Sequence, residues 1–137
     1  MDHLIEWRYS RTPVSVPRAR AHFAVQSREW KLPADTAETA VLLLSELMTN
    51  ACRHARVSGR EVWVRCERGD GVVRVEVADA DGKLPVPAVA RELDESGRGL
   101  AIVAELASRW GAYPRECGIG KVVWFEVEWP AEESGRG

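Results

Sequence analysis

Residues 43–55 read LLSELMTNACRHA and lie within the strongest helical pattern of the chain. Between positions 36 and 55, apolar residues recur at 41, 44, 48, 51 and 55, close to the helical period of about 3.6 residues. On the other side of the same pattern, the spacings of four and three residues place Glu46, Asn50 and Arg53 together. We therefore predict a helix over 36–55 with one packing face and one polar face.

The flanking segments predict a layer of helices on a sheet. Weak alternation indicates an edge strand over 4–10, followed by a first helix over 19–30 with Ser15 as its N-cap. Two alternating runs, 62–66 and 73–77, flank the turn Gly69-Asp70-Gly71 and predict a β-hairpin. The remaining expected elements are a loop over 80–96, a helix over 97–110 that stops at Gly111, and a hairpin pairing 112–117 with 121–129. This order predicts an α+β fold, a two-layer α/β sandwich with helices on one face of a mixed, mostly antiparallel sheet.

Composition restricts the classes of protein that fit. A chain of 137 residues with 45% hydrophobic content suits one domain, which we place at 1–130, with a flexible C-terminal tail at 131–137. A net charge of −2 argues against direct nucleic-acid binding. No apolar run approaches the ~20 residues of a membrane span, so we expect a cytoplasmic protein without a membrane partner. Cys52, Cys66 and Cys117 lack the paired spacing of a zinc site and are expected to be free thiols.

The polar face of the 36–55 helix has the residue types of a magnesium–phosphate site. An amide oxygen such as that of Asn50 is a neutral, hard ligand for Mg²⁺. A carboxylate one turn away, Glu46, can take a proton from an attacking oxygen, and Arg53 adds positive charge for phosphate. The same spacing also fits an ordinary solvated helix face, so the spacing alone leaves both interpretations open.

Two further segments could contact a nucleotide. Asp79 follows the strand at 73–77, where a carboxylate can accept a hydrogen bond from an exocyclic amine such as that of adenine, and Gly82 allows close approach of a flat base. The segment SGRGL at 96–100 places glycines at the start of a helix, where unpaired N–H groups and the helix dipole favour phosphate. A turn residue and a glycine-rich hinge are the plain alternatives.

Taken in this order, the motifs resemble those of the GHKL (Bergerat-fold) ATPases and kinases, and among them the small bacterial anti-sigma-factor serine kinases. LLSELMTNACRHA resembles the N-box, and VEVAD at 75–79 resembles the strand that leads to the adenine-binding Asp. SGRGL resembles the glycine box at the end of the lid, and GKVVWF at 120–125 resembles the final glycine box. The resemblance covers about residues 15–127.

The resemblance implies a role for each matching residue. Glu46 would be the general base, Asn50 the magnesium ligand and Asp79 the adenine anchor. Gly97 and Gly99 would belong to the lid over the phosphates. The full set expected to contact the nucleotide is Asn50, Arg53, Asp79, Gly82, Gly97, Arg98, Gly99 and Leu100.

The implied activity is that of a serine/threonine protein kinase that uses ATP and Mg²⁺. Its partners would be an anti-anti-sigma protein that it phosphorylates on serine and a sigma factor that it sequesters, and a homodimer remains open. Two departures from the family pattern support an alternative, a catalytically weak, nucleotide-gated protein-binding module. Asp81 replaces the usual glycine, with Gly82 one place late, and Val122 stands where many members have Thr or Ser. An ATPase that transfers phosphate to water is the third and least favoured interpretation.

Overall fold

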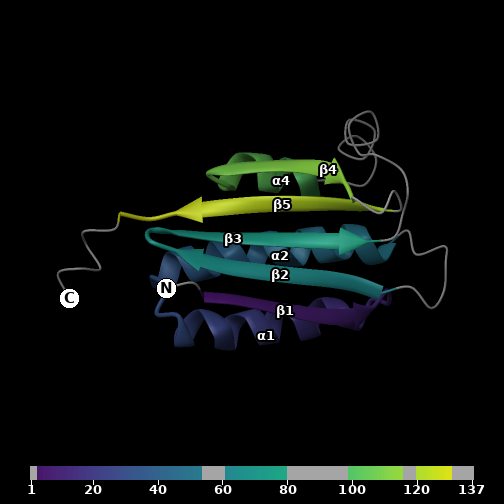
Figure 1. Ribbon diagram of the computed structural model, residues 1–137, viewed down its shortest axis with the longest axis horizontal. Coiled ribbons are helices and arrows are strands. Elements are labelled where there is room, and N and C mark those ends of the chain that lie inside the picture. The colour runs from purple at the N-terminus through teal and green to yellow at the C-terminus, as the bar shows by residue number, and fades with distance from the viewer. Residues whose placement is uncertain (1–2, 54–60, 80–98, 116–119, 131–137) are drawn as a thin grey trace.

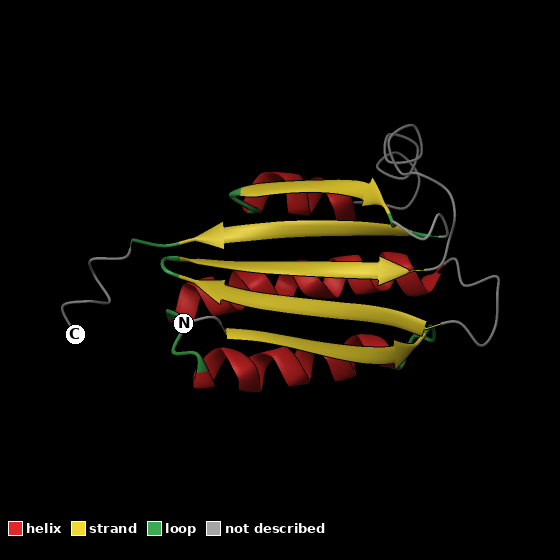
Figure 2. Ribbon diagram, in the orientation of Figure 1, coloured by secondary structure: helices red, strands yellow, loops and turns green. Residues whose placement is uncertain are grey.

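The computed structural model describes residues 3–53, 61–79, 99–115 and 120–130, and these form a sheet with helices on one face (Figure 1, Figure 2). The elements in chain order are β1 (His3–Ser10), α1 (Ser15–Glu29), α2 (Ala34–Arg53), β2 (Glu61–Gly69), β3 (Val72–Asp79), α4 (Gly99–Leu106), β4 (Arg109–Pro114) and β5 (Lys121–Glu128). The predicted α+β sandwich is confirmed. Within the described residues, no helix combines the length and apolarity that crossing a membrane requires.

The strands lie in the order β1-β2-β3-β5-β4, and every neighbouring pair of described strands is antiparallel. The expectation of a mixed sheet was therefore wrong for this part of the chain. The predicted hairpin is confirmed, because β2 pairs with β3 across the turn at Gly71, whose φ of 79° suits glycine. Side chains alternate along β2 and β3, so one face of each strand is buried and the other is not.

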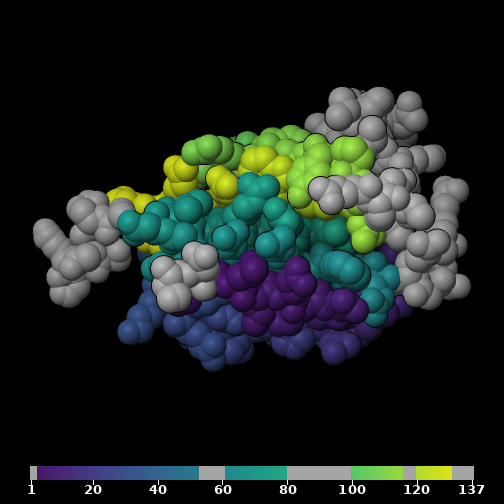
Figure 3. All heavy atoms as spheres, viewed as in Figure 1, coloured from purple at the N-terminus to yellow at the C-terminus, as the bar shows by residue number. Residues whose placement is uncertain are grey.

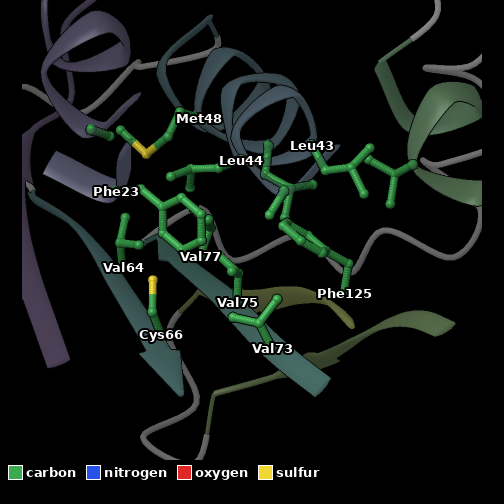
Figure 4. Close-up of a cluster of buried hydrophobic side chains, with 14 of the residues drawn as sticks. Phe23, Leu43, Leu44, Met48, Val64, Cys66, Val73, Val75, Val77 and Phe125 are labelled. Carbon is green, nitrogen blue, oxygen red and sulfur yellow. The ribbon is translucent and has the colours of Figure 1, made fainter. Parts of the chain in front are cut away.

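α2 is the central helix of the layer, since it packs between α1 and α4 and against β3 and β5. Its Leu44 and Met48 are completely buried, as the apolar pattern within 36–55 predicts, and Leu43, which lies outside that pattern, is completely buried as well. Figure 4 shows them facing Phe23 of α1 and Phe125 of β5, with valines of β3 below. The core therefore lies between this helix and the middle of the sheet.

Arginine side chains cover aromatic rings on the face of the sheet that carries no helices. The guanidinium carbon of Arg74 lies 4.0 Å from the ring centre of Trp124, and that of Arg8 lies 4.5 Å from the ring centre of Trp63. Arg74 also donates hydrogen bonds to Glu76 and Glu126. Figure 3 views this face, where side chains of β1, β2, β3 and β5 lie side by side. Cation–π contacts and ion pairs thus connect arginine, tryptophan and glutamate side chains on the open face.

The first helix begins earlier than predicted. α1 starts at Ser15, and the residue at the N-cap position is Val14, which makes no side-chain cap bond. Ser15 instead donates its hydroxyl to the carbonyl of Ser10 at 2.7 Å, so it joins the helix to the end of β1. Pro17 falls in the first helical turn, where the N–H that proline lacks has no intrahelical partner to lose.

The helix predicted over 97–110 is shorter in the structure. α4 ends at Leu106, and the strand expected from position 112 begins already at Arg109. Gly111 is therefore not a helix stop: it lies within β4, opposite Trp124 of β5. A Cβ atom at Gly111 would lie 3.0 Å from the Trp124 ring, so the glycine allows the indole to pack across β4. Pairing with β5 satisfies the backbone of 109–111, which outweighs its local helical pattern.

Arg11 holds the C-terminal end of α2. It lies directly after β1, is only 7% exposed, and donates from Nε to the carbonyl oxygen of Ala51 at 3.2 Å. That carbonyl is among the last four of α2, which have no intrahelical N–H partner. A cation here also suits the negative end of the helix dipole. Arg11 thus fixes the last turn of α2, which includes Asn50, against the end of β1.

We expect the packing face of α2 to dominate its stability. Leu44→Ala should lower the free energy of unfolding by ~2–5 kcal/mol, since it leaves a cavity in the core. Leu42→Ala on the same helix is the matched control, because Leu42 is 41% exposed, and it should cost less than ~1 kcal/mol. Urea unfolding of both variants measures the difference, and equal losses would contradict the assigned face.

Arg11→Met should lower the free energy of unfolding by ~1–3 kcal/mol, because it keeps the volume of the side chain but leaves the Ala51 carbonyl without its donor. Hydrogen exchange should also become faster in the last turn of α2. Arg20→Met, on the exposed side of α1, removes the same charge and should change neither quantity. The role of Arg11 would be refuted if both variants exchanged alike in α2.

Candidate functional site

The candidate site lies at one end of the sheet, where β1 and β3 end and β5 begins (Figure 1). α2 ends at the same side of the molecule, as the Arg11 contact requires. Asp79 is the last residue of β3 and is only 4% exposed. It continues the inward row of Val73, Val75 and Val77, so a carboxylate occupies the fourth place in a line of apolar side chains. A charge at such a position needs compensation, because burial removes its hydration.

Lys121 supplies that compensation. Its ammonium donates to Asp79 Oδ2 at 3.1 Å and to Oδ1 at 3.4 Å. The two residues are direct cross-strand partners of β3 and β5, and their side chains are 5% and 18% exposed for Asp79 and Lys121 respectively. Sequence reasoning missed Lys121, because it paired the last strand with 112–117 alone and did not predict the β3–β5 neighbourhood. Lys121 could have been found only by predicting that β3 pairs with β5, in the register that places Lys121 opposite Asp79.

Val122 lies on the other side of the sheet from Asp79. It pairs with Ala78, and it alternates with Val123, which packs against the core. Successive side chains of a strand point to opposite faces, so a hydroxyl at position 122 would not face the Asp79 carboxylate. Valine at position 122, in place of Thr or Ser, therefore removes no hydroxyl from the surroundings of the Asp79 carboxylate. Lys121, the neighbour of Val122 on β5, does contact the carboxylate.

A buried thiol lies near the same carboxylate. Burial raises the pKa of Cys52, the charge of Arg11 lowers it in part, and the charge of Asp79 raises it further. Arg11 and Asp79 thus act on the pKa of this thiol in opposite directions. Cys52 and Cys66 are both free, as predicted, whereas Cys117 lies outside the described residues.

The polar side of α2 carries the two predicted residues of the phosphate end. Glu46 and Asn50 lie one turn apart and are each partly buried, on a different face from Leu44 and Met48. They follow Leu43 by three and seven residues, so they border the buried side of α2. Arg53 is the last residue of α2. The helix thus brings Glu46 and Asn50 together as the spacing predicts.

The structure describes only two residues of the predicted glycine box at 96–100, Gly99 and Leu100. Gly99 is the first residue of α4, as expected for a glycine at a helix start, and the side chain of Leu100 is buried in the core. Gly82, Gly97 and Arg98 lie outside the described residues, as do Asp81 and the predicted 80–96 loop.

The oxygen donors on α2 fit magnesium better than a metal that needs a complete protein cage. Among the described residues, no group of three or more His, Cys, Asp and Glu could hold a metal ion. Mg²⁺ needs no such group, because it keeps several waters and binds one or two protein oxygens together with substrate phosphates. The amide oxygen of Asn50 and the carboxylate of Glu46 are donors of this kind.

Known proteins share this arrangement of sheet and helices. The crystal structure of the RsbU and RsbW domains of Rv1364c from Mycobacterium tuberculosis is similar, with a TM-score of 0.68 and 21% sequence identity, covering 94% of this chain and 34% of that one. At this identity the likeness shows a shared fold, and this chain spans about a third of that protein's chain. A search of curated proteins returned no match. Residues 9–127 match the family described as the histidine kinase-like ATPase domain. Because the match covers most of the sequence, the chain belongs to the histidine kinase-like ATPase domain family.

Proposed function

We propose that this protein is an ATP- and Mg²⁺-dependent serine/threonine protein kinase of the anti-sigma-factor type. It phosphorylates an anti-anti-sigma partner on serine and sequesters a sigma factor. The observation that carries the proposal is the buried Asp79 carboxylate at the end of β3, on the same side of the molecule as the end of α2 that bears Glu46 and Asn50. The similar structure from Mycobacterium tuberculosis contains an RsbW domain, and this likeness supports the proposed class.

The base of the nucleotide would bind at Asp79. A charged acceptor in a poorly hydrated place forms stronger hydrogen bonds than a neutral one, and adenine offers an exocyclic amine as the donor. The apolar valines that precede Asp79 along β3 restrict water around the carboxylate. Recognition of the base thus comes from one ionised side chain on a rigid strand.

The phosphates would bind along the polar side of α2. Asn50 would hold Mg²⁺, which supplies positive charge to the phosphate oxygens when bound. Glu46 would accept the proton of the attacking serine hydroxyl, and its place one turn before Asn50 would keep base and metal ligand close together. Arg53 would add positive charge, and Gly97, Arg98 and Gly99 would close over the phosphates.

A nucleotide-gated binding module is the second candidate, and the Asp79–Lys121 ion pair favours it. A base that uses Asp79 must share the carboxylate with an ammonium 3.1 Å away. Weak binding of nucleotide would suit a protein that changes its partner surface with ATP but transfers phosphate slowly. Measurements of binding and of transfer separate the two candidates.

Asp79→Asn should weaken ATP binding by ~1–3 kcal/mol, because a neutral amide replaces the charged acceptor. Glu76→Gln is the matched control: it makes the same chemical change on the same strand, but on the open face, where Glu76 pairs with Arg74. Calorimetry with Mg²⁺ and ATP measures both, alongside unfolding curves that report any loss of fold from the broken Lys121 pair. Equal affinities for the two variants would remove Asp79 from the nucleotide site.

Glu46→Ala should leave ATP affinity nearly unchanged and slow phosphoryl transfer ~10²–10⁴-fold, because a general base acts on the attacking hydroxyl in the transition state. Asn50→Ala should weaken Mg²⁺-dependent ATP binding and transfer together. Glu38→Ala, an exposed residue on the same helix, should change neither.

A single-turnover assay measures transfer, with ATP labelled on its γ-phosphate and the serine-bearing partner captured from source cells. Equal slow transfer by the wild type and Glu46→Ala would refute the kinase. A different result would support the binding module. In that case the wild type and Glu46→Ala bind the partner equally well, and neither transfers labelled phosphate to it.

A further inference from the structure

The ion pair between Asp79 and Lys121 changes which hydrogen bonds this end of the sheet can offer a ligand. A lone carboxylate presents acceptors only. Here an ammonium lies 3.1 Å from Oδ2 and 3.4 Å from Oδ1, so the pair presents acceptors and donors side by side. Lys121 is also the more exposed member, at 18% against 5%, so a ligand that approaches the carboxylate meets the lysine.

Adenine and guanine differ in the groups that would meet this pair. The six-membered ring of adenine carries an amine donor beside a ring-nitrogen acceptor, whereas that of guanine carries a carbonyl acceptor beside N–H donors. A lone carboxylate therefore suits adenine, and it meets the carbonyl of guanine with like partial charge. Beside Lys121, the same carbonyl finds a charged donor, and the neighbouring N–H groups of guanine can donate to Asp79.

We propose that Lys121 is a specificity-determining residue of the nucleotide site and that it makes the site accept a purine with a carbonyl at position 6 as well as adenine. This inference rests on the proposed nucleotide-binding function and assigns its base selectivity. The cross-strand register places Lys121 directly opposite Asp79, so the effect arises from the β3–β5 pairing and not from a mobile side chain that happens to reach the site.

The pair also contributes to the fold, and the test must separate that role from selectivity. Removing one partner of a buried ion pair leaves an uncompensated charge, which lowers stability whatever the ligand. A purely structural clamp would therefore change the affinity for every nucleotide equally when it is weakened. A selectivity role changes the ratio of affinities, which loss of stability alone leaves unaltered.

The experiment measures dissociation constants for ATP, GTP and ITP with Mg²⁺ by calorimetry on the full chain. In the wild type, GTP and ITP should bind within about tenfold of ATP. Lys121→Met should raise the preference for ATP over GTP and over ITP by ~10–100-fold, because the purine carbonyl loses its charged donor. Lys31→Met is the matched control: it removes the same charge at an exposed position between α1 and α2 and should leave all three constants unchanged.

Two outcomes would overturn the inference while leaving the proposed function intact. One is a Lys121→Met protein that binds nucleotides with the wild-type ratio of affinities within about twofold. The other needs no variant: wild-type protein that binds ATP more than about a hundredfold tighter than both GTP and ITP. If the wild type binds none of the three nucleotides, the proposed function itself is refuted, and the base selectivity with it.

Discussion

Burial of the apolar side of α2 against β3 and β5 is the contact on which the rest of the molecule depends. Leu43, Leu44 and Met48 are completely buried there, and α1 and α4 pack on either side of the same helix. Because the helical period is fixed, anchoring this face also fixes the direction of Glu46 and Asn50. The packing of α2 on the sheet therefore also orients the polar residues of the candidate site.

A charge at the end of an apolar row is the second constraint. Three buried valines precede Asp79 on the inward side of β3. A carboxylate at such a place must either pair with a cation or become protonated. Lys121 provides the partner, and Arg11 adds positive charge near Cys52 at the same end of the molecule. Buried ion pairs of this kind contribute little net stability compared with apolar packing. This pair lies at a strand end, on the same side of the molecule as the end of α2, where we propose that the nucleotide binds.

The kinase and the binding module use the same site and differ in what happens at Glu46. Both need a base pocket at Asp79 and a phosphate region along α2. The shared fold with the RsbU and RsbW domain structure is compatible with either, since a fold hosts several functions and the residues of the site decide among them. Lys121 would affect the choice of base under either proposal, because it pairs with Asp79, the proposed contact of the base.

Local patterns in the sequence were sufficient for the α2 helix, the β2–β3 hairpin, the position of Asp79 at a strand end and the one-turn spacing of Glu46 and Asn50. Each of these depends on residues within one or two elements, where side-chain period and turn chemistry act directly. The tertiary structure alone decided that β3 pairs with β5, that β4 begins at Arg109, and that Arg11 reaches α2. Asp79 and Lys121 are 42 residues apart and Arg11 and Ala51 are 40 apart, and no local period encodes which distant segment becomes the neighbour. Lys121 therefore became part of the site only when the sheet register placed it opposite Asp79.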